Sequence, residues 1–264
     1  MIRDAKADVI HIATEGPLGL SARMWCKRNM RPFTTAYHTK FPEYIQARYG
    51  IPLKVGYAFM RWFHSAASKT MVATGSLKND LESHGFKNLV FWSRGVDINL
   101  FHPREKRAMK HLRPIFLCVG RVAVEKNLEA FLDLDLPGSK VIIGDGPDLA
   151  SLRNAYPEAH FLGAMEGKVL AEHFADADCF VFPSKTDTFG LVLLEAMASG
   201  VPVAAYPVTG PIDIVTPHQT GSLNEDLQTA ATEALRCSSE DCRKFAEQYS
   251  WANCAKQFLC NLEK

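Results

Sequence analysis

The sequence predicts an α/β protein with two Rossmann-like domains, each built on a parallel sheet, the first of them incomplete. Short apolar and β-branched runs alternate with helix-like segments along the chain, which is typical of βα units whose sheets are covered on both faces. The 264 residues are 47% apolar and include 17 Gly and 14 Pro, a composition that suits a folded chain. Charge also divides the chain: residues 1–113 carry 19 Lys and Arg against 8 Asp and Glu, whereas residues 114–264 carry 11 against 21.

The first set of strand-like runs is short and makes a thin sheet, with helix-like segments between its members. We interpret Trp62-Phe63-His64, in the second of these helices, as packing residues, with contact to an acceptor or a lipid as the alternative. The predicted strands are Asp8–Ala13, Phe33–Tyr37, Thr70–Ala73 and Leu89–Trp92, and the predicted helices are Leu18–Arg28, Val55–Ser68 and Leu77–Ser83.

The second set has the pattern of a complete sheet. Beyond Thr220 the chain is expected to be helical, with Ser238 and Ser239 at an N-terminal cap and a last amphipathic helix after Ser250. The predicted strands are Pro114–Val119, Lys140–Ile143, His160–Leu162, Cys179–Phe182 and Val203–Tyr206, and the predicted helices are Asn127–Leu132, Asp148–Ala155, Lys168–Ala175 and Phe189–Ala198.

The domain organisation follows from these two sets. Residues 101–113 are basic and show no periodicity, which predicts a linker. We therefore expect a partial first domain over residues 1–100, a second domain over 114–245, and a helix over 246–264 that could pack back on the first domain. The excess of Lys and Arg in the first half is either ordinary solubilising charge or a surface for an anionic substrate or membrane. No nucleic-acid-binding motif accompanies it, so no nucleic acid partner is expected.

The sequence shows no targeting or membrane-spanning segment. Its longest uncharged apolar stretches are far shorter than the roughly 20 residues that cross a bilayer, and its N-terminus lacks the apolar core of a signal peptide. We expect a cytoplasmic protein, either free or on the inner face of a membrane. Seven cysteines show neither a CxxC pair nor zinc-finger spacing, so we expect reduced thiols, including Cys237 and Cys242.

The most informative stretch runs from Phe182 to Gly200, FPSKTDTFGLVLLEAMASG. It predicts a buried strand, a polar loop and an apolar helix whose N-terminus faces the carboxyl edge of a parallel sheet. Free backbone N–H groups and the positive end of the helix dipole favour an anion there, and Gly190 lets a ligand approach the backbone. Asp187 precedes the helix and Glu195 lies inside it, so their carboxylates could bind the two ends of one extended diphosphate ligand.

Further motifs accompany this stretch along nearly the whole chain. They are His11-Ile12-Ala13-Thr14-Glu15-Gly16-Pro17-Leu18-Gly19, Thr35-Ala36-Tyr37-His38-Thr39, Arg94-Gly95-Val96-Asp97, Val119-Gly120-Arg121, Glu125-Lys126-Asn127 and Gly144-Asp145-Gly146-Pro147. In these motifs the chain resembles the retaining glycosyltransferases of the GT-B fold, family 4, and within them a mannosyltransferase-like and sulfolipid-synthase-like branch. The family places two glutamates eight positions apart, and this chain has Asp187 in the first position and Glu195 in the second.

The resemblance implies a role for each matching residue. Glu195 would bind the ribose of a GDP- or UDP-linked sugar donor, Asp187 would lie beside the transferred sugar, and His38 would contact that sugar from the first domain. Arg121 and Lys126 would neutralise the leaving diphosphate in place of a metal ion or other cofactor. The implied catalytic residues are Asp187, His38, Arg121 and Lys126, and the implied donor-binding residues are Gly120, Arg121, Lys126, Gly144, Gly163, Met165, Asp187, Thr188, Phe189, Gly190, Leu191, Val192 and Glu195.

The same resemblance implies a front-face substitution in which the departing phosphate helps to deprotonate the hydroxyl of a lipid or glycan acceptor. A glycosidase mechanism needs a second acid on the opposite side of the bond, and the sequence places none opposite Asp187. Asp176-Ala177-Asp178 precedes an apolar strand instead of following one, so we interpret it as a helix end and not as a DxD metal motif. Backbone atoms near residues 163–166 are expected to contact the base of the donor.

Similar enzymes begin with about three further βα units in the first domain that have no counterpart here. On that basis we expect weak solubility or self-association, and little or no turnover by this chain alone. Two alternatives to a transferase stay open: a non-catalytic module that binds nucleotide sugars, and an epimerase or phosphorylase of the same architecture. A phosphorylase needs a lysine for pyridoxal phosphate, and no recognisable setting for one is present.

Overall fold

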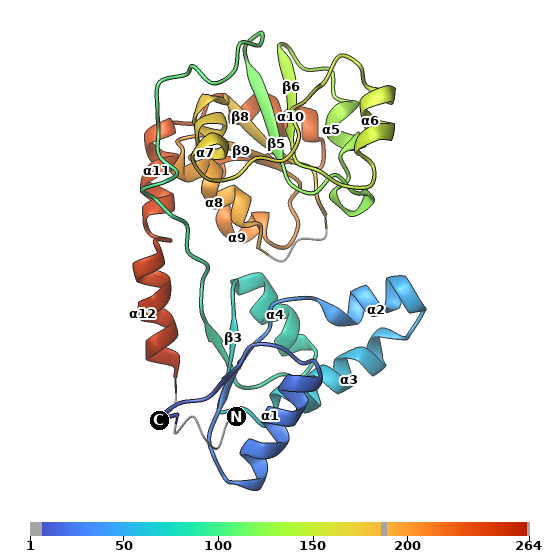
Figure 1. Cartoon of the computed structure of the whole chain (residues 1–264), viewed down its shortest axis with the longest axis vertical. Coiled ribbons are helices and arrows are strands. Elements are labelled where there is room, and N and C mark those ends of the chain that lie inside the picture. The colour runs from blue at the N-terminus through green and yellow to red at the C-terminus, as the bar shows by residue number, and fades with distance from the viewer. Residues whose placement is uncertain (1–6, 186–188, 263–264) are drawn as a thin grey trace. The chain divides into compact units, whose positions relative to one another are not determined.

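The computed structural model describes residues 7–185 and 189–262, which form two compact units (Figure 1). Unit 1 comprises Met1–Arg94 together with Cys254–Lys264, and unit 2 comprises Gly95–Asn253. Residues 101–113, which we expect to be a linker, are thus part of unit 2, and most of the last helix is part of unit 1. Within the described ranges, no helix has the length and apolar content that crossing a membrane requires.

Unit 1 is built on a parallel sheet of order β1-β2-β3-β4. The four predicted strands and three predicted helices are present, and a further helix, α2, fills a stretch for which we predict no element. Unit 1 contains β1 (His11–Ile12), α1 (Pro17–Arg28), β2 (Thr34–Ala36), α2 (Phe41–Tyr49), α3 (Leu53–His64), β3 (Lys69–Val72), α4 (Gly75–Ser83), β4 (Leu89–Phe91) and the greater part of α12 (Trp251–Asn261).

The two faces of this sheet have different coverings. Ile12 and Val72 belong to clusters with side chains of α1, α3 and α4, so these helices cover one face. On the other face, the rings of His11 and Trp92 lie 5.0 and 4.8 Å from the ring of Phe258 in α12. Residue alternation along the strands therefore separates a helix-packed face from a face lined by imidazole and indole rings.

Unit 2 is built on a parallel sheet of order β10-β9-β8-β5-β6-β7. It contains β5 (Ile115–Val119), the 3₁₀ turn η1 (Val124–Lys126), α5 (Glu129–Leu132), β6 (Ser139–Ile143), α6 (Leu149–Ala155), β7 (His160–Phe161), α7 (Gly167–Asp176), β8 (Cys179–Phe182), α8 (Leu191–Ala198), β9 (Val203–Ala205), α9 (Pro211–Ile214), β10 (Gly221–Leu223), α10 (Leu227–Ala234) and α11 (Ser239–Glu247).

Helices cover both faces of the second sheet, as the apolar strands require. Phe116 and Val181 pack in a cluster with side chains of α5, α6 and α10. On the other face Phe180 contacts Phe174 of α7, with 5.5 Å between the ring centroids. Both parallel sheets and their Rossmann-like arrangement confirm the predicted fold class.

Two predictions for unit 2 are wrong in detail. The chain beyond Thr220 is not only helical, because β10 pairs in parallel with β9. Its sequence, Gly-Ser-Leu, carries no β-branched signal, and Gly221 is needed because a Cβ there would lie 2.0 Å from the carbonyl oxygen of Val203. The helix predicted from Phe189 begins at Leu191, because Gly190 takes a left-handed conformation (φ 77°) that ends the preceding loop.

Candidate functional site

The candidate site lies where the strand order of the second sheet reverses. From the central strand β5 the chain proceeds outward through β6 to β7, and it then returns to β8 on the other side of β5. Loops that follow β5 and β8 therefore leave the carboxyl edge in opposite directions. In open parallel sheets this arrangement forms the crevice in which ligands bind.

Three glycines place bare backbone along this edge. Gly120, Gly144 and Gly163 follow β5, β6 and β7, and the Gly144 N–H donates to the Gly163 carbonyl (2.9 Å). A Cβ on Gly144 would lie 1.8 Å from the carbonyl oxygen of Gly120, so no side chain fits between these loops. The half-buried Met165 lies two residues beyond Gly163. The loops expected to contact the donor are thus neighbours at one edge of the sheet.

The N-terminus of α8 lies at the same edge, after β8. Gly190 is its N-cap, and the first amides of a helix have no intrahelical acceptor. The buried side chain of Phe189 fixes the residue before the cap, and Leu191 and Val192 begin the helix. The geometry is that of an anion site formed by backbone N–H groups. The two other residues assigned to this loop, Asp187 and Thr188, lie outside the residues that the structure describes.

Glu195 is on the second turn of α8 and is largely buried. Burial raises the pKa of its carboxyl group to about 7. Within residues 7–185 and 189–262, no hydrogen bond or ion pair to this carboxyl group is found. A buried carboxyl group in this state gains from a ligand that donates hydrogen bonds, as the hydroxyls of a ribose can.

The loop after β5 supplies two cations and an amide. The Arg121 guanidinium is exposed and lies 3.4 Å from the carboxylate of Glu125. Lys126 is half-buried, and its charge opposes the rise that burial causes in the pKa of the Cys118 thiol. Asn127, in a left-handed conformation, donates from Nδ2 to the carbonyl oxygen of Pro183 (3.0 Å) and so joins the loops after β5 and β8. This role of Asn127 is not apparent from the sequence, although the Glu-Lys-Asn motif contains the residue.

In unit 1, His38 follows β2 on the face that carries His11 and Trp92. The Arg94 Nη2 lies 2.5 Å from the His38 Nδ1, and the His38 and Trp92 rings are 5.8 Å apart. Burial, and next the charge of Arg94, lower the pKa of His38 to about 4. Because Arg94 can only donate, Nδ1 is the acceptor, and the neutral imidazole carries its proton on Nε2.

A buried chain of polar side chains supports the neighbouring loop of unit 1. The fully buried His64 makes hydrogen bonds at both ring nitrogens: Nε2 donates to the Glu15 carboxylate (3.0 Å), and Nδ1 lies 2.9 Å from the Thr35 hydroxyl. The Thr35 hydroxyl in turn lies 3.0 Å from that of Thr70. His64 is therefore a packing residue, as predicted, but one that also fixes Glu15, whose charge acts on His38. In the sequence, Glu15 stands out only as part of a motif.

The structure thus brings those predicted residues of unit 2 that it describes to one edge of one sheet, and it places His38 in unit 1. No group of three or more His, Cys, Asp or Glu side chains with the geometry of a metal site is found among the described residues. Asp176 ends α7, as predicted, and its carboxylate is paired with Arg113. All seven cysteines are free thiols.

Comparisons with known proteins agree with this architecture. The family model described as Glycosyltransferase Family 4 matches residues 1–100, and that described as Glycosyl transferases group 1 matches residues 113–241. The chain is 36% identical over 232 residues to a GDP-mannose-dependent alpha-mannosyltransferase of Mycobacterium tuberculosis, covering 84% of this chain and 61% of the relative. It is also 36% identical over 279 residues to sulfoquinovosyl transferase SQD2 of Arabidopsis thaliana, covering 93% of this chain and 54% of the relative.

The chain therefore spans little more than half the length of these relatives. Among solved structures, it is similar to Anabaena HepE in complex with UDP, with a TM-score of 0.76 and 16% identity, covering 95% of this chain and 77% of that one. This likeness confirms the GT-B fold. Because the two family models together cover most of the sequence, the chain belongs to the family-4 glycosyltransferases, in their mannosyltransferase-like and sulfolipid-synthase-like branch.

Proposed function

We propose that this chain is the greater part of a retaining glycosyltransferase that moves a sugar from a nucleoside diphosphate to a hydroxyl of a lipid or glycan. One observation carries the proposal: at the switch point of the second sheet, bare glycine backbone and the N-terminus of α8 lie together with Glu195, which is largely buried and has no partner among the described residues. The nucleotide sugars that this family uses carry a ribose and a diphosphate. The ribose hydroxyls need a hydrogen-bond acceptor, and the diphosphate oxygens need hydrogen-bond donors.

The donor binds in an extended conformation along this edge. Its diphosphate accepts hydrogen bonds from the amides at residues 189–192, and its ribose hydroxyls donate to Glu195. Lys126 and Arg121 neutralise the leaving diphosphate without a metal ion, because two cations beside the reacting phosphate supply the charge that a metal would otherwise provide. Asp187 and the backbone near Gly163 complete the donor site.

His38 contacts the transferred sugar. Its neutral imidazole, with the proton on Nε2, donates a hydrogen bond to a sugar hydroxyl while carrying no charge beside the developing oxocarbenium ion. The departing phosphate, and not a protein side chain, takes the proton from the acceptor hydroxyl. The mechanism therefore needs no strong nucleophile in the protein.

The donor sugar is mannose or a glucose-like sugar, and its nucleotide is GDP or UDP. The printed names of the relatives support this range, since one uses GDP-mannose, another transfers sulfoquinovose, and the HepE structure holds UDP. A thermal-shift panel of GDP-mannose, UDP-glucose, UDP-sulfoquinovose and UDP-N-acetylglucosamine tests this. A ligand at 100 times its Kd stabilises the fold by about 2.7 kcal/mol, so the true donor should give the largest rise in Tm.

A non-catalytic binding module is the second candidate, because the chain spans only 61% and 54% of the relatives above. The same panel followed by a transfer assay with a radiolabelled donor separates the two. Donor binding with transfer to a lipid or glycan extract supports the transferase. Donor binding with neither transfer nor donor hydrolysis supports the binding module, and no shift with any donor contradicts both.

For the acceptor, we propose a lipid reached from an anionic membrane surface. Unit 1 carries 16 Lys and Arg against 7 Asp and Glu over residues 1–94 and 254–264. On α3, the exposed apolar residues Val55, Phe59 and Trp62 follow the spacing i, i+4, i+7, so they share one outward face. A net positive charge together with an exposed apolar helix face is the combination that holds a protein on an anionic bilayer.

A further inference from the structure

A carboxylate of unit 1 lies beside His38 at the carboxyl edge of the first sheet. Glu15 follows β1 and His38 follows β2, and these two strands pair in parallel, so both residues lie at the same edge. Burial and the charge of Arg94 lower the pKa of His38, and the charge of Glu15 opposes them, which places the carboxylate near the imidazole. Since His38 contacts the transferred sugar in the proposed function, Glu15 lies next to the place of transfer.

The position of Glu15 is fixed before any ligand binds. Its Oε1 accepts a hydrogen bond from Nε2 of the fully buried His64 (3.0 Å), and the Thr35 hydroxyl holds the other ring nitrogen (2.9 Å). The backbone around Glu15 packs tightly against α1, because a Cβ on Gly19 would lie 1.8 Å from the carbonyl oxygen of Thr14. A group held in this way is suited to orient a substrate.

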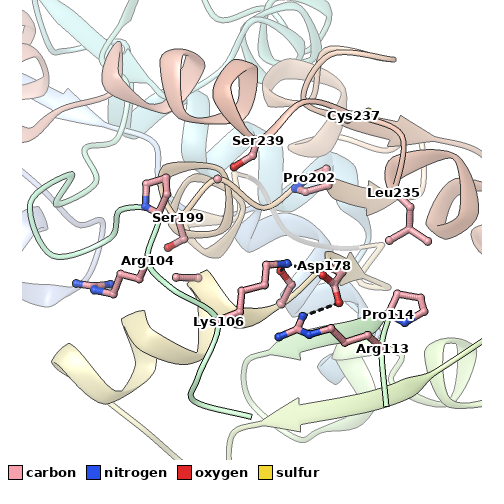
Figure 2. A pocket seen from close by; sticks show the side chains of 14 residues that line it. Arg104, Lys106, Arg113, Pro114, Asp178, Ser199, Pro202, Leu235, Cys237 and Ser239 are labelled. Atoms are coloured by element: carbon pink, nitrogen blue, oxygen red, sulfur yellow. Dashed lines mark hydrogen bonds and ion pairs between the residues drawn. The ribbon is translucent and has the colours of Figure 1, made fainter. Parts of the chain in front are cut away.

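The Glu15 carboxylate has fewer donors than its burial requires. Its side chain is 9% exposed, and Oε2 reaches the surface without a partner among residues 7–185 and 189–262. By comparison, the Asp178 side chain is 19% exposed and accepts hydrogen bonds from Lys106, Arg113 and the Ile115 amide; Figure 2 shows the two cations. A ligand that donates a hydrogen bond to Oε2 would therefore stabilise the largely buried Glu15 carboxylate.

The chemistry of Oε2 limits what this ligand is. An ionised carboxyl oxygen only accepts hydrogen bonds, so it suits a hydroxyl. It does not suit a phosphate group, whose oxygens also accept and whose charge has the same sign. In the proposed function the diphosphate binds to amides of unit 2, and His38 contacts the transferred sugar. The remaining substrate with hydroxyls is the acceptor.

We propose that Glu15 binds a hydroxyl of the acceptor, and that the acceptor headgroup is an uncharged sugar or polyol. This inference rests on the proposed transferase function. During transfer, the bond from the sugar to the phosphate oxygen breaks, a bond to the reacting acceptor oxygen forms, and the proton of that hydroxyl goes to the phosphate. Glu15 takes no proton and holds a second hydroxyl of the acceptor. A lipid with one hydroxyl, such as a diacylglycerol, or with a phosphorylated headgroup does not meet this requirement.

NMR titration of the whole chain with methyl α-D-glucopyranoside, methyl α-D-mannopyranoside and glycerol tests the proposal, with and without the nucleotide sugar chosen by the donor panel. At least one probe should shift the His38 imidazole signal and leave those of His111 and His160, which stack together in unit 2, unchanged. Glucose 6-phosphate, mannose 6-phosphate and glycerol 3-phosphate should bind at least tenfold more weakly. Glu15→Gln keeps an acceptor for His64 but loses the charge, so it should weaken binding of the neutral probe about tenfold and remove the discrimination against phosphates.

Glu43→Gln is the matched control. Glu43 is also a carboxylate of unit 1 that accepts from one side chain, the Tyr57 hydroxyl (2.5 Å), but its second oxygen is enclosed. This variant should bind every probe as the wild type does. The Tm of each variant shows whether it folds, and the comparison of neutral with phosphorylated probes in the wild type needs no variant.

Four results would each overturn the proposal. They are no shift of His38 with any neutral probe, equal binding of neutral and phosphorylated probes, competition between the neutral probe and the nucleotide sugar, and equal effects of Glu15→Gln and Glu43→Gln. Competition would assign Glu15 to the transferred sugar instead of the acceptor. Both variants should bind the nucleotide sugar as the wild type does. A chain that binds no nucleotide counts against the proposed function, whereas the probes decide the role of Glu15.

Discussion

Glu195 is a buried carboxyl group that is poised between its two protonation states near neutral pH. Its ordinary pKa is 4.5, and burial raises it to about 7. Because the folded chain binds this proton more tightly than the unfolded chain, the stability it contributes is present below pH 4.5 and is lost as the pH rises to about 7. A ligand whose hydroxyls donate to the carboxylate would favour the ionised form.

For Glu195→Gln we expect opposite effects on stability and on binding. At pH 8 the variant without ligand should be more stable than the wild type by about 1–3 kcal/mol, because no charge is buried. Its donor affinity should fall about tenfold or more, and the rise in wild-type affinity between pH 6 and pH 8 should vanish. Urea unfolding and calorimetry at both pH values measure these effects, and unchanged affinity at pH 8 would refute the role of Glu195.

His38 is held neutral by its surroundings. Because its pKa is about 4 in the folded chain and 6.5 ordinarily, the free energy of unfolding should rise with pH across this interval. Arg94→Met removes the second-largest cause of the depression, so the pKa of His38 should rise towards, but not reach, 6.5. NMR titration of the imidazole measures this. Trp92→Phe, which alters a ring contact and no charge, is the control, and an equal shift in both variants would exclude a specific effect of Arg94.

At the scale of elements, the loops after β5 and β6 are held together by direct contact between two backbones. Gly120 and Gly144 have nearly the same φ, 154° and 152°, but they differ in their surroundings. A Cβ on Gly144 would lie 1.8 Å from a carbonyl oxygen, whereas a Cβ on Gly120 has no described atom within 4 Å. Alanine substitutions at these two glycines therefore distinguish two causes of lost stability: an unfavourable backbone conformation alone at Gly120, and a steric clash in addition at Gly144.

Gly144→Ala should lower the free energy of unfolding by more than about 3 kcal/mol, because the two loops must move apart. Gly120→Ala should cost only about 1–2 kcal/mol, the penalty for an unfavourable φ. Urea denaturation of both variants measures the difference. Similar losses of stability in the two variants would show that the loops are not packed as described.

Elements that are predicted correctly have a strong local sequence signal for secondary structure. Elements that are not predicted have a weak one. Runs such as Ile115–Val119 and Cys179–Phe182 are apolar and flanked by turns, and they are strands as predicted. By contrast β10 is a strand because β9 lies beside it, and nothing in Gly-Ser-Leu shows this in advance. For the site, sequence motifs identify Gly190 and Glu195. The hydrogen bonds of Asn127 to Pro183 and of His64 to Glu15 join residues far apart in the sequence, so they form only when the chain folds.

For the whole molecule, the division of charge is the main long-range feature. Unit 1 carries an excess of nine positive charges, and unit 2, over residues 95–253, has 14 Lys and Arg against 22 Asp and Glu. A chain charged in this way is attracted to an anionic surface through one unit only. This attraction weakens as salt shortens the Debye length, which is about 10 Å at 0.1 M.

Sedimentation with vesicles should therefore show binding to bilayers that contain phosphatidylglycerol, little binding to neutral bilayers, and release at high salt. Val55→Glu places a carboxylate on the exposed face of α3 and should reduce binding about tenfold. Val169→Glu makes the same change at a similarly exposed valine of unit 2 and should have no such effect. Equal effects of the two variants, or binding that ignores lipid charge, would contradict the membrane proposal.

The proposed transferase function depends above all on the position at which the nucleotide binds. A crystal structure of the chain with the donor chosen by the thermal-shift panel measures this most directly. We predict diphosphate oxygens within hydrogen-bonding distance of the amides of residues 189–192, and ribose hydroxyls on the Glu195 carboxylate. A nucleotide bound elsewhere, with these amides and Glu195 facing only solvent, would contradict the account.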